Sequence, residues 1–455
     1  MTADGEPPPS GARSRVRSLV LARPLLGSTL AVAAVTTIAR FNGGVREVLI
    51  AREFGTAESL EAFLVAFALV SVMIDALTGA VPSSLIPTIH VRRSDGDRTA
   101  EVLGAILPPA LGAALVLVVG LAVGSAPVAA LIAGGFDAPA RDQVRVAMVV
   151  LAPTVLFGMA SSVASACLQD RARFVSAVVP SLASPIVAIG VVLVFPPSAT
   201  TLAAAFCAGY AAELSVAFVL AAARGIRVAR PHPTDGRSDR QLFVREFLAI
   251  AVGLLVVSSM NVTDQAVATH LDQGQVAIFA FGSRLSWFLS AVGVTAVGLV
   301  VMPQFARLAG SGEWLRLRSS MLAKARLVLV ATVAGSVALF LFAGPMVELV
   351  FGHGEFTAAD AEAAAAVQRF AAWQVPFQVV GVVFARVLSA RHRNRSILVV
   401  AIVVAAANLV ADLALAPHLG ARGLALSTVI GSALACGAYL VLAVRAVTSG
   451  AEVSR

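Results

Sequence analysis

The chain consists of long apolar stretches separated by short segments rich in charged residues, proline and glycine. Each stretch reaches about 20 residues or more, the length that an α-helix needs to cross the hydrocarbon core of a bilayer. The pattern predicts twelve membrane-spanning helices, over residues 24–52, 60–89, 101–125, 143–167, 175–195, 200–223, 243–269, 275–304, 323–350, 364–390, 395–415 and 422–446. The expected fold class is an all-α polytopic membrane protein.

A basic segment that includes Pro231, Pro233 and Gly236 separates the helices into two groups of six. We expect this segment to be a cytoplasmic linker between two lobes. The predicted parts of the chain are a basic tail (1–23), an N-lobe (24–223), the linker (224–242), a C-lobe (243–446) and a C-terminal tail (447–455).

The two halves also resemble each other. The segment Leu131–Asp137 recurs as Leu349–Phe356, and a helix with an internal proline follows each copy. Pro87 and Pro303, 216 residues apart, are expected to close corresponding helices. Because six helices separate the copies, both halves insert with the same orientation, which is typical of parallel repeats about an axis along the membrane normal. A substrate would then bind between the lobes.

Composition and charge support this topology. The 455 residues are 58% hydrophobic and 13% charged, against roughly 45–50% and about 25% in soluble domains, which excludes a soluble globule. The net charge is +8, but the basic residues lie between apolar stretches, so we expect no nucleic-acid partner. Of the 34 Lys and Arg residues, 25 fall in the tails and alternate connecting segments and five in the others. This bias places both termini in the cytoplasm.

No enzyme motif is present. The sequence lacks a phosphate-binding loop, a nucleophile elbow and an HExxH motif. Cys167, Cys207 and Cys436 fall inside apolar stretches without a CxxC pattern, so neither a metal nor a disulfide is expected. The chemistry favours a non-enzymatic transporter that needs no organic cofactor and draws on a gradient or on substrate flow.

Arginines inside predicted helices are candidates for anion binding, because an ionisable residue in the membrane is costly unless it has a function or a partner. Arg40, Arg46 and Glu47 lie in the first helix, and Arg284 lies in the eighth. A guanidinium presents several donors to phosphate oxygens. The alternatives are a structural ion pair of Arg40 with Glu47 or Asp264, and solvation of Arg46, Glu47 and Arg52 near the outer surface.

Oxygen-bearing side chains in later helices suggest a cation site. Asn408 and Asp412 share a helix face, Thr428 lies in the last helix, and Asp264 in the seventh adds a second charge. The alternative is hydrogen bonding between helices. Three further ionisable residues are assigned to the lining of a wet cavity: Asp75, Glu213 and Arg386.

Several segments carry a family resemblance: Ala39–Gly55, Glu61–Phe67, the loop at Gly135, Gly354–Asp360 and Gly423–Ser427. They resemble the MurJ (MviN) family of lipid II flippases, whose first helix reads SRVLGxxRDxxxAxxFG and is followed by DAFxVAF. The resemblance extends over nearly all twelve helices. It implies the V-shaped, two-lobed fold of the multidrug/oligosaccharidyl-lipid/polysaccharide exporter superfamily.

The resemblance also implies roles for individual residues. Arg40, Arg46 and Arg284 look like matches to family arginines that engage the pyrophosphate of lipid II. Sodium-coupled members are similar at the four positions of the suggested cation site: Asp264, Asn408, Asp412 and Thr428. The candidates for gating or cavity-lining carboxylates are Glu47, Glu61 and Asp75.

The sequence also departs from the family. Ile74 and Asp75 stand where the family has an arginine pair, and Ser283 stands where it has an aspartate before the helix 8 arginine. Many members have two further C-terminal helices, whereas this chain has twelve predicted helices. These differences leave the identity of the lipid-linked glycan open.

The expected function is to move an undecaprenyl-pyrophosphate-linked peptidoglycan precursor, lipid II, across the bacterial cytoplasmic membrane by alternating access, with sodium as coupling ion. One alternative is a flippase for another lipid-linked oligosaccharide, or a cation-coupled exporter. Another is a non-transporting membrane scaffold, which would tolerate loss of charge at Arg40 and Arg284. The expected partners are the lipid-linked glycan, membrane lipids and cell-wall synthesis enzymes.

Overall fold

The structure is a computed structural model that describes residues 11–93, 99–229, 235–391 and 393–453. Over these residues the chain forms helices and no strand. The elements are α1 (Gly11–Phe54), α2 (Glu58–Arg93), α3 (Thr99–Val123), α4 (Ser125–Ile132), α5 (Ala138–Leu151), α6 (Pro153–Asp170), α7 (Phe174–Val178), the 3₁₀ helix η1 (Val179–Leu182), α8 (Ala183–Val194), α9 (Ala199–Ala223), α10 (Asp235–Ala268), α11 (Gln275–Gly310), α12 (Trp314–Leu341), α13 (Ala343–Phe351), α14 (Ala358–Ala371), α15 (Gln374–Ala390), α16 (Asn394–Leu419) and α17 (Ala421–Val453).

The predicted fold class is confirmed. Within the described residues, eleven helical segments are long and apolar enough to cross a membrane, and each overlaps one of the predicted helices. α1 covers the remaining predicted helix, at 24–52, and is not one of these eleven.

Several predicted helices are divided in the structure. The prediction at 143–167 corresponds to α5 and α6, which meet at Ala152, and the prediction at 364–390 corresponds to α14 and α15. The prediction at 323–350 was wrong at both ends, because α12 begins at Trp314 and ends at Leu341, and the following residues form the separate short helix α13. Pro153 explains the first division, since it lacks the N–H that would continue the ladder of α5.

The proposed role of Pro87 and Pro303 as helix ends was wrong. α2 continues past Pro87 to Arg93, and α11 continues past Pro303 to Gly310. Packing against neighbouring helices keeps such a helix intact, and this is why prolines are tolerated inside membrane helices.

The helices also extend beyond the predicted lobe boundaries. α1 begins at Gly11, inside the predicted tail, α10 begins at Asp235, inside the predicted linker, and α17 continues to Val453. An apolar pattern predicts the part of a helix that contacts lipid or protein. The backbone hydrogen bonds of the same helix can continue into the polar sequence on either side.

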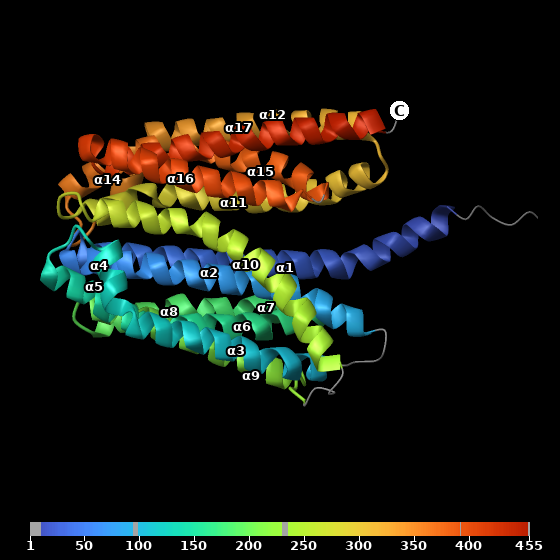
Figure 1. Cartoon of the computed structure of the whole chain (residues 1–455), viewed down its shortest axis with the longest axis horizontal. Coiled ribbons are helices and arrows are strands. Elements are labelled where there is room, and N and C mark those ends of the chain that lie inside the picture. Colours follow the sequence, from blue (N-terminus) through green and yellow to red (C-terminus); the bar gives the residue numbers. More distant parts are fainter. Residues whose placement is uncertain (1–10, 94–98, 230–234, 392, 454–455) are drawn as a thin grey trace, which may run out of the picture.

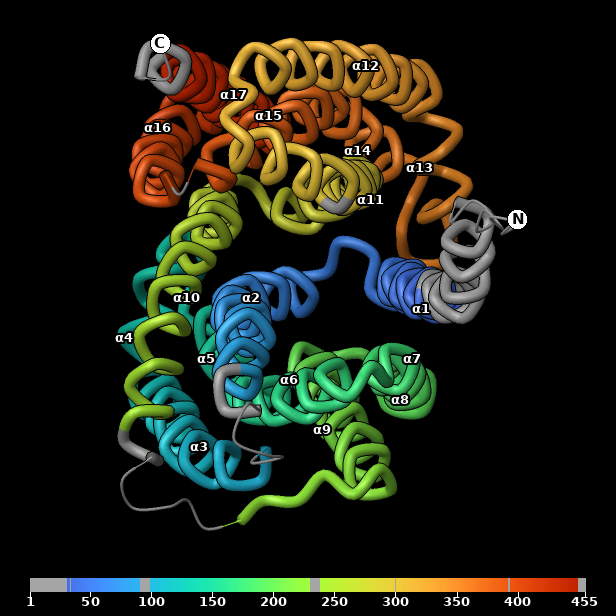
Figure 2. The backbone as a smooth tube through the Cα atoms, turned by 90° about the vertical axis from the view of Figure 1, so that its right-hand side faces the viewer, coloured from blue at the N-terminus to red at the C-terminus, as the bar shows by residue number. Residues whose placement is uncertain are grey.

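The helices form two groups. α2 to α9 lie on one side and α11 to α17 on the other, while α1 and α10 lie between the groups (Figures 1 and 2). The order of elements repeats, because the long α3 and the short α4 precede the divided pair α5 and α6, as α12 and α13 precede α14 and α15. The internal repeat seen in the sequence therefore corresponds to a structural repeat.

The two lobes share one hydrophobic cluster at one end of the molecule. It joins Phe63 of α2 and Phe206 of α9 to Phe281 of α11 and Phe351 of α13, with Ile50 of α1 between them. This end, where α1 finishes and where α2 and α11 begin, is named the closed end.

At the opposite end the core is divided. One cluster belongs to the first lobe and includes Leu85 and Met159 together with Phe243 of α10. A separate cluster in the second lobe includes Phe305 and Val383. Because no described cluster joins the lobes here, they pack together at the closed end and part towards the opposite one.

The divided end carries the segments that the charge pattern assigned to one side of the membrane. Arg171 Nη1 donates to the Arg224 carbonyl oxygen at 2.7 Å, and the Arg391 guanidinium lies 4.3 Å from the centre of the Trp314 ring. The C-terminal end of α17 lies at the same end (Figure 1). We name it the basic end.

Candidate functional site

Two arginines and a glutamate form an ion-paired group between the lobes. Glu47 of α1 accepts from Arg46 Nη2 at 3.1 Å and from Arg284 Nη2 of α11 at 2.5 Å. The exposed fraction is 15% for the Glu47 side chain, 16% for Arg46 and 33% for Arg284. Two predicted pyrophosphate ligands, from helices about 240 residues apart, are therefore brought to one carboxylate.

Aromatic rings position both guanidinium groups. Arg46 lies 4.1 Å from the centre of the Phe206 ring, and Arg284 lies 5.8 Å from the centre of the Trp287 ring. The Nε atoms of both arginines are buried without a hydrogen-bond partner among the described residues. Each guanidinium therefore keeps a donor for a further acceptor, and this suits a group with several oxygens such as a phosphate.

Arg40 lies apart from this group. It is exposed on α1, about two turns before Glu47, and has no ion-pair partner within the described part of the chain. The suggested pairing of Arg40 with Glu47 or Asp264 was wrong, because Glu47 is paired with Arg46 and Arg284. Solvation fits Arg52, whose side chain is 64% exposed, but not Arg46 and Glu47, whose side chains are 16% and 15% exposed and partly covered by aromatic and charged neighbours.

The four predicted cation ligands come together in the second lobe. Asn408 Nδ2 of α16 donates to Asp264 Oδ1 of α10 at 2.7 Å and to Asp412 Oδ2 at 2.9 Å. Thr428 Oγ1 of α17 donates to Asp264 Oδ2 at 3.4 Å. Ser427 Oγ donates to Asp412 Oδ1 and completes the group.

Ser427 was missed by the sequence reasoning. The available signal was its position beside Thr428 at the end of the segment Gly423–Ser427. A helix places adjacent residues 100° apart, so neighbours on α17 can reach two different carboxylates. Their spacing does not reveal which carboxylate each hydroxyl meets.

This acidic group is deeply buried and held by neutral donors. Asp264 is 3% exposed, and Asn408, Asp412 and Ser427 are fully buried. The Asn408 Oδ1 atom has no hydrogen-bond partner among the described residues. Carboxylate, amide and hydroxyl oxygens are suitable ligands for a hard cation, whereas no group of three His, Cys, Asp or Glu within the described residues has the arrangement of a metal site.

Glu61 joins the lobes at the closed end. It lies in the first turn of α2 and is 1% exposed. Its Oε1 atom accepts from the backbone N–H groups of Val276 at 2.8 Å and Ala277 at 3.3 Å, in the first turn of α11. The carboxylate thus satisfies free donors at a helix N-terminus, where the helix dipole also favours negative charge.

The repeated loop of the second half takes part in the same contact. The Glu355 N–H donates to the Arg52 carbonyl oxygen at 2.8 Å. Gly354 has a φ of +69°, and a Cβ atom there would lie 2.7 Å from Arg52 Cγ. Thr56 Oγ1 also donates to Asp360 Oδ1 at 3.3 Å. The glycine is therefore required by both its backbone angle and this close approach.

The remaining candidate carboxylate, Asp75, lies apart from both groups. It is exposed on α2 and has no ion-pair partner among the described residues, whereas its neighbour Ile74 is buried. The gating or cavity-lining role expected of Asp75 stays a prediction.

Comparison with known proteins adds independent findings. A family model described as "Lipid II flippase MurJ" matches residues 50–454. The lipid II flippase MurJ of Burkholderia cenocepacia is 25% identical over 435 residues, covering 90% of this chain and 82% of the relative. The probable lipid II flippase MurJ of Thermotoga maritima is 24% identical over 405 residues, covering 88% and 81%.

Solved structures show the same fold. A lipid II flippase MurJ in an inward closed conformation has a TM-score of 0.77 at 18% identity, covering 91% of this chain and 87% of that one. An inward-facing multidrug resistance MATE family transporter also scores 0.77, at 15% identity, covering 94% and 99%. An outward-facing structure of a MATE transporter scores 0.63 at 15% identity, covering 93% and 96%. At these identities the likeness concerns the fold alone.

Proposed function

The chain belongs to the MurJ family of lipid II flippases, and we propose that it moves lipid II from the cytoplasmic to the outer leaflet of the bacterial cytoplasmic membrane by alternating access. The observation that carries this proposal is the pair of arginines, Arg46 and Arg284, that meets Glu47 between the lobes. The pair lies beside the shared cluster of the closed end, where a bound group would contact both lobes.

The ion-paired group suits recognition of a diphosphate. Each guanidinium offers donors in a fixed plane, and a diphosphate has oxygens enough to engage both. In the present conformation Glu47 occupies the donors that a diphosphate would take. Substrate binding would therefore exchange one anion for another and weaken a contact that joins α1 to α11. Arg40, which is exposed on α1, would add a further contact.

The closed end would form the outer gate. The basic end carries most of the positive charge, so the positive-inside rule places it, with both termini, in the cytoplasm. The lobes then face the cytoplasm and are held shut outside by Glu61, by Thr56 with Asp360, and by the shared hydrophobic cluster. Opening to the outside requires these contacts to break.

Cation binding would bias this equilibrium. Asp264 lies near the end of α10, which packs along α2 in the first lobe and along α16 in the second. An ion that binds α10 and α16 more tightly in one conformation shifts the population towards it, and this difference in affinity is what coupling requires. We propose sodium as that ion, held by Asp264, Asn408, Asp412 and Thr428.

One observation favours a lipid-linked glycan other than lipid II as the substrate. Asp75 is exposed on α2 at a position where the family has an arginine, so its charge would oppose an anionic group there. A flippase for a different undecaprenyl-linked oligosaccharide is therefore the second candidate. If lipid II is the substrate, we also propose that the protein associates with cell-wall synthesis enzymes.

The test is complementation. A bacterial strain whose own lipid II flippase can be depleted is supplied with this chain, and growth and lipid II exposure on the outer leaflet are measured after depletion. We expect growth to be restored and lipid II to become accessible outside. Normal membrane levels of the chain without either effect would contradict lipid II as substrate, and rescue of a strain lacking another glycan-lipid flippase would identify the second candidate.

A further inference from the structure

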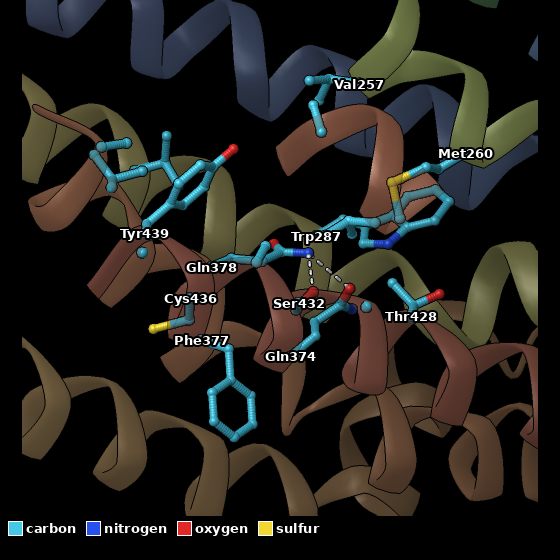
Figure 3. A pocket seen from close by; sticks show the side chains of 18 of the residues that line it. Val257, Met260, Trp287, Gln374, Phe377, Gln378, Thr428, Ser432, Cys436 and Tyr439 are labelled. Atoms are coloured by element: carbon cyan, nitrogen blue, oxygen red, sulfur yellow. Dashed lines mark hydrogen bonds between the residues drawn. The ribbon is translucent and has the colours of Figure 1, made fainter. Parts of the chain in front are cut away.

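The second lobe contains a cavity of about 470 Å³ that leads to the acidic group. Its walls come from α10, α11, α15, α16 and α17. Thr428 lies at one end, and Cys436 and Tyr439 lie towards the other (Figure 3). Asp264, which accepts from Thr428 Oγ1, also lines the cavity. A volume in this range is typical of sites that hold small ligands, and apart from Asp264 and Thr428 its lining residues have no role in the functions described above.

The cavity extends from Asp264 towards the basic end. α10 runs from the basic end to the closed end, and Val257, which lines the cavity, precedes Asp264 by seven residues. α17 runs in the opposite direction, and Tyr439 follows Thr428 by eleven residues. At 1.5 Å per residue the cavity therefore covers roughly 10–16 Å along these helices on the basic side of the acidic group.

Packing seals the other side of the acidic group. Between Asp264 and the closed end, Ala268 of α10 is 1% exposed and Ala371 of α14 is 1% exposed. Leu424 and Ala425 of α17 are 0% and 1% exposed. A second hollow of about 490 Å³, lined by His270, Gln275 and Arg422 among others, lies on the closed-end side of this lobe. Small and branched apolar side chains separate it from the acidic group, whereas the first cavity reaches Asp264 and Thr428 directly.

Most of the cavity lining is apolar, and a few polar side chains interrupt it. On α15 and α17, Gln378 Nε2 donates to Gln374 Oε1 at 3.1 Å and to Ser432 Oγ at 3.3 Å, so a bridge joins the two walls midway (Figure 3). Asn261 lies one turn before Asp264 on the same face of α10. Its Oδ1 atom is buried without a hydrogen-bond partner among the described residues.

We propose that this cavity is the passage through which a hydrated monovalent cation moves between the basic end and Asp264. The cation contacts Asn261 Oδ1 before it reaches the acidic group. Gln378, whose hydrogen bonds cross the cavity, must change its side-chain conformation to let the cation pass. The inference rests on the cation coupling proposed above and adds its direction. An ion bound in this conformation exchanges with the basic end while the closed end is sealed.

The charge and the oxygen atoms favour a small cation over other occupants. The acidic group contributes two carboxylates, and its hydrogen bonds come from neutral Asn, Ser and Thr side chains. A hydrocarbon chain would leave the Asn261 and Asn408 oxygens unsatisfied, which is costly in a buried site. A hydrated cation satisfies both oxygens, either by direct coordination or through a hydrogen bond from one of its water molecules.

Cys436 provides a reporter that already lines the cavity. Cys167→Ala and Cys207→Ala leave it as the remaining cysteine of the full-length protein. Inverted and right-side-out membrane vesicles are treated with a membrane-impermeant quaternary ammonium methanethiosulfonate and with a sulfonate reagent of similar size. The matched control carries Cys436→Ala and Leu434→Cys, because Leu434 lies two residues away on the exposed face of α17.

We expect Cys436 to react at least tenfold faster in inverted vesicles than in right-side-out vesicles, and several-fold faster with the cationic than with the anionic reagent. The control at position 434 should react slowly from both sides. Slow reaction of Cys436 from both sides, faster reaction in right-side-out vesicles, or equal rates for the two reagents would each overturn the passage. Reaction with an apolar maleimide alone would identify a hydrocarbon site instead.

Sodium binding supplies the second measurement. Asn261→Leu should raise the sodium concentration for half-maximal thermal stabilisation at least tenfold. Gln378→Leu should change that sodium concentration less than twofold. After rapid mixing with sodium, the fluorescence of Trp287, which lines the cavity, should change at a rate that differs at least fivefold between this variant and the unmodified protein. Unchanged values in both variants would overturn the assignment of these residues.

The two proposals fail differently. Sodium stabilisation together with an unreactive Cys436 would remove the passage and leave the coupling proposal standing. A reactive, cation-selective cavity without any sodium effect on the unmodified protein would remove sodium as the coupling ion, and with it the role proposed for the cavity.

Discussion

Arg284 Nη2 lies 2.5 Å from Glu47 Oε2, so an ion pair joins α11 of the second lobe to α1. The same carboxylate also accepts from Arg46. A buried carboxylate with two cationic partners is held strongly, and separating the partners leaves uncompensated charge. The Glu47–Arg284 ion pair therefore stabilises one conformation of the lobes. A bound anion that replaced Glu47 as the partner of Arg284 would break this contact between α1 and α11.

Removing the Arg284 charge should abolish complementation while membrane levels stay near normal. Arg284→Ala loses the anion contact, and its side chain is one-third exposed, so little core volume must be rebuilt. Arg284→Lys should rescue growth only in part, because an ammonium cannot reproduce the planar guanidinium fork. Growth after depletion is the measurement.

The matched control is Arg369→Ala, at an exposed position of α14. It should grow like the unmodified protein. Full growth of the Arg284→Ala strain at equal expression would exclude this residue from the substrate site.

The cross-lobe ion pair should be measurable as a coupling free energy. A double-mutant cycle of Glu47→Gln and Arg284→Gln is followed by denaturant unfolding of the purified protein, and we expect a coupling of about 1–2 kcal/mol. Asp142 and Arg145, whose exposed side chains pair at 2.8 Å, provide the comparison. Their coupling should be about 0–1 kcal/mol, and equal values for both pairs would show that the cross-lobe contact has no special strength.

Loss of the Glu61 carboxylate should open the closed end. Glu61→Leu leaves the Val276 and Ala277 N–H groups without their acceptor, so the state that is sealed outside loses stability. A cysteine introduced by Ala277→Cys, at a fully buried position, should then react faster with an impermeant reagent added to intact cells. Glu61→Gln keeps an acceptor oxygen and should show a smaller increase, whereas an unchanged rate in both variants would argue against a gate at Glu61.

Sodium should stabilise the protein by mass action. At a concentration 100 times the dissociation constant, a ligand that binds only the folded state contributes about 2.7 kcal/mol. Asp412→Asn should remove most of this effect, because it keeps a carbonyl oxygen and deletes a charge. Thermal unfolding is compared in sodium and choline chloride at matched ionic strength.

Asp75→Asn is the control, since Asp75 lies on α2 in the first lobe and should leave the sodium effect intact. Equal unfolding temperatures of the unmodified protein in the two salts, at saturating sodium, would leave interhelical hydrogen bonding as the account of the acidic group.

The orientation of the chain can be tested with single cysteines in a background without the native three. Ser238→Cys, near the start of α10, should not react with an impermeant reagent applied to intact cells, because the basic end is expected to face the cytoplasm. Ala358→Cys, at the exposed start of α14 near the closed end, should react. The opposite pattern would reverse the orientation.

Hydrophobic patterning along the chain was enough to predict the helical class, the two halves and most of the membrane spans. The reason is that the bilayer core offers no water to hydrogen-bond the backbone N–H and C=O groups. A single long apolar segment can satisfy these groups by itself as an α-helix. Asn408 and Asp412 could also be placed on one face, since helical spacing is local. Where the sequence failed, at the ends of α12 and at Pro87 and Pro303, neighbouring helices decided how far a helix continues.

Which ionisable groups meet depends on the packing of helices that are far apart in the sequence. Glu47 pairs with Arg284, 237 residues away, and Asp264 meets Asn408 across two helices. Ser427 and the capping role of Glu61 could not be inferred from local spacing, because each depends on the rotation of one helix against a distant one. Helix rotation is set by the packing of many side chains together, and a sequence pattern records only the face each helix offers.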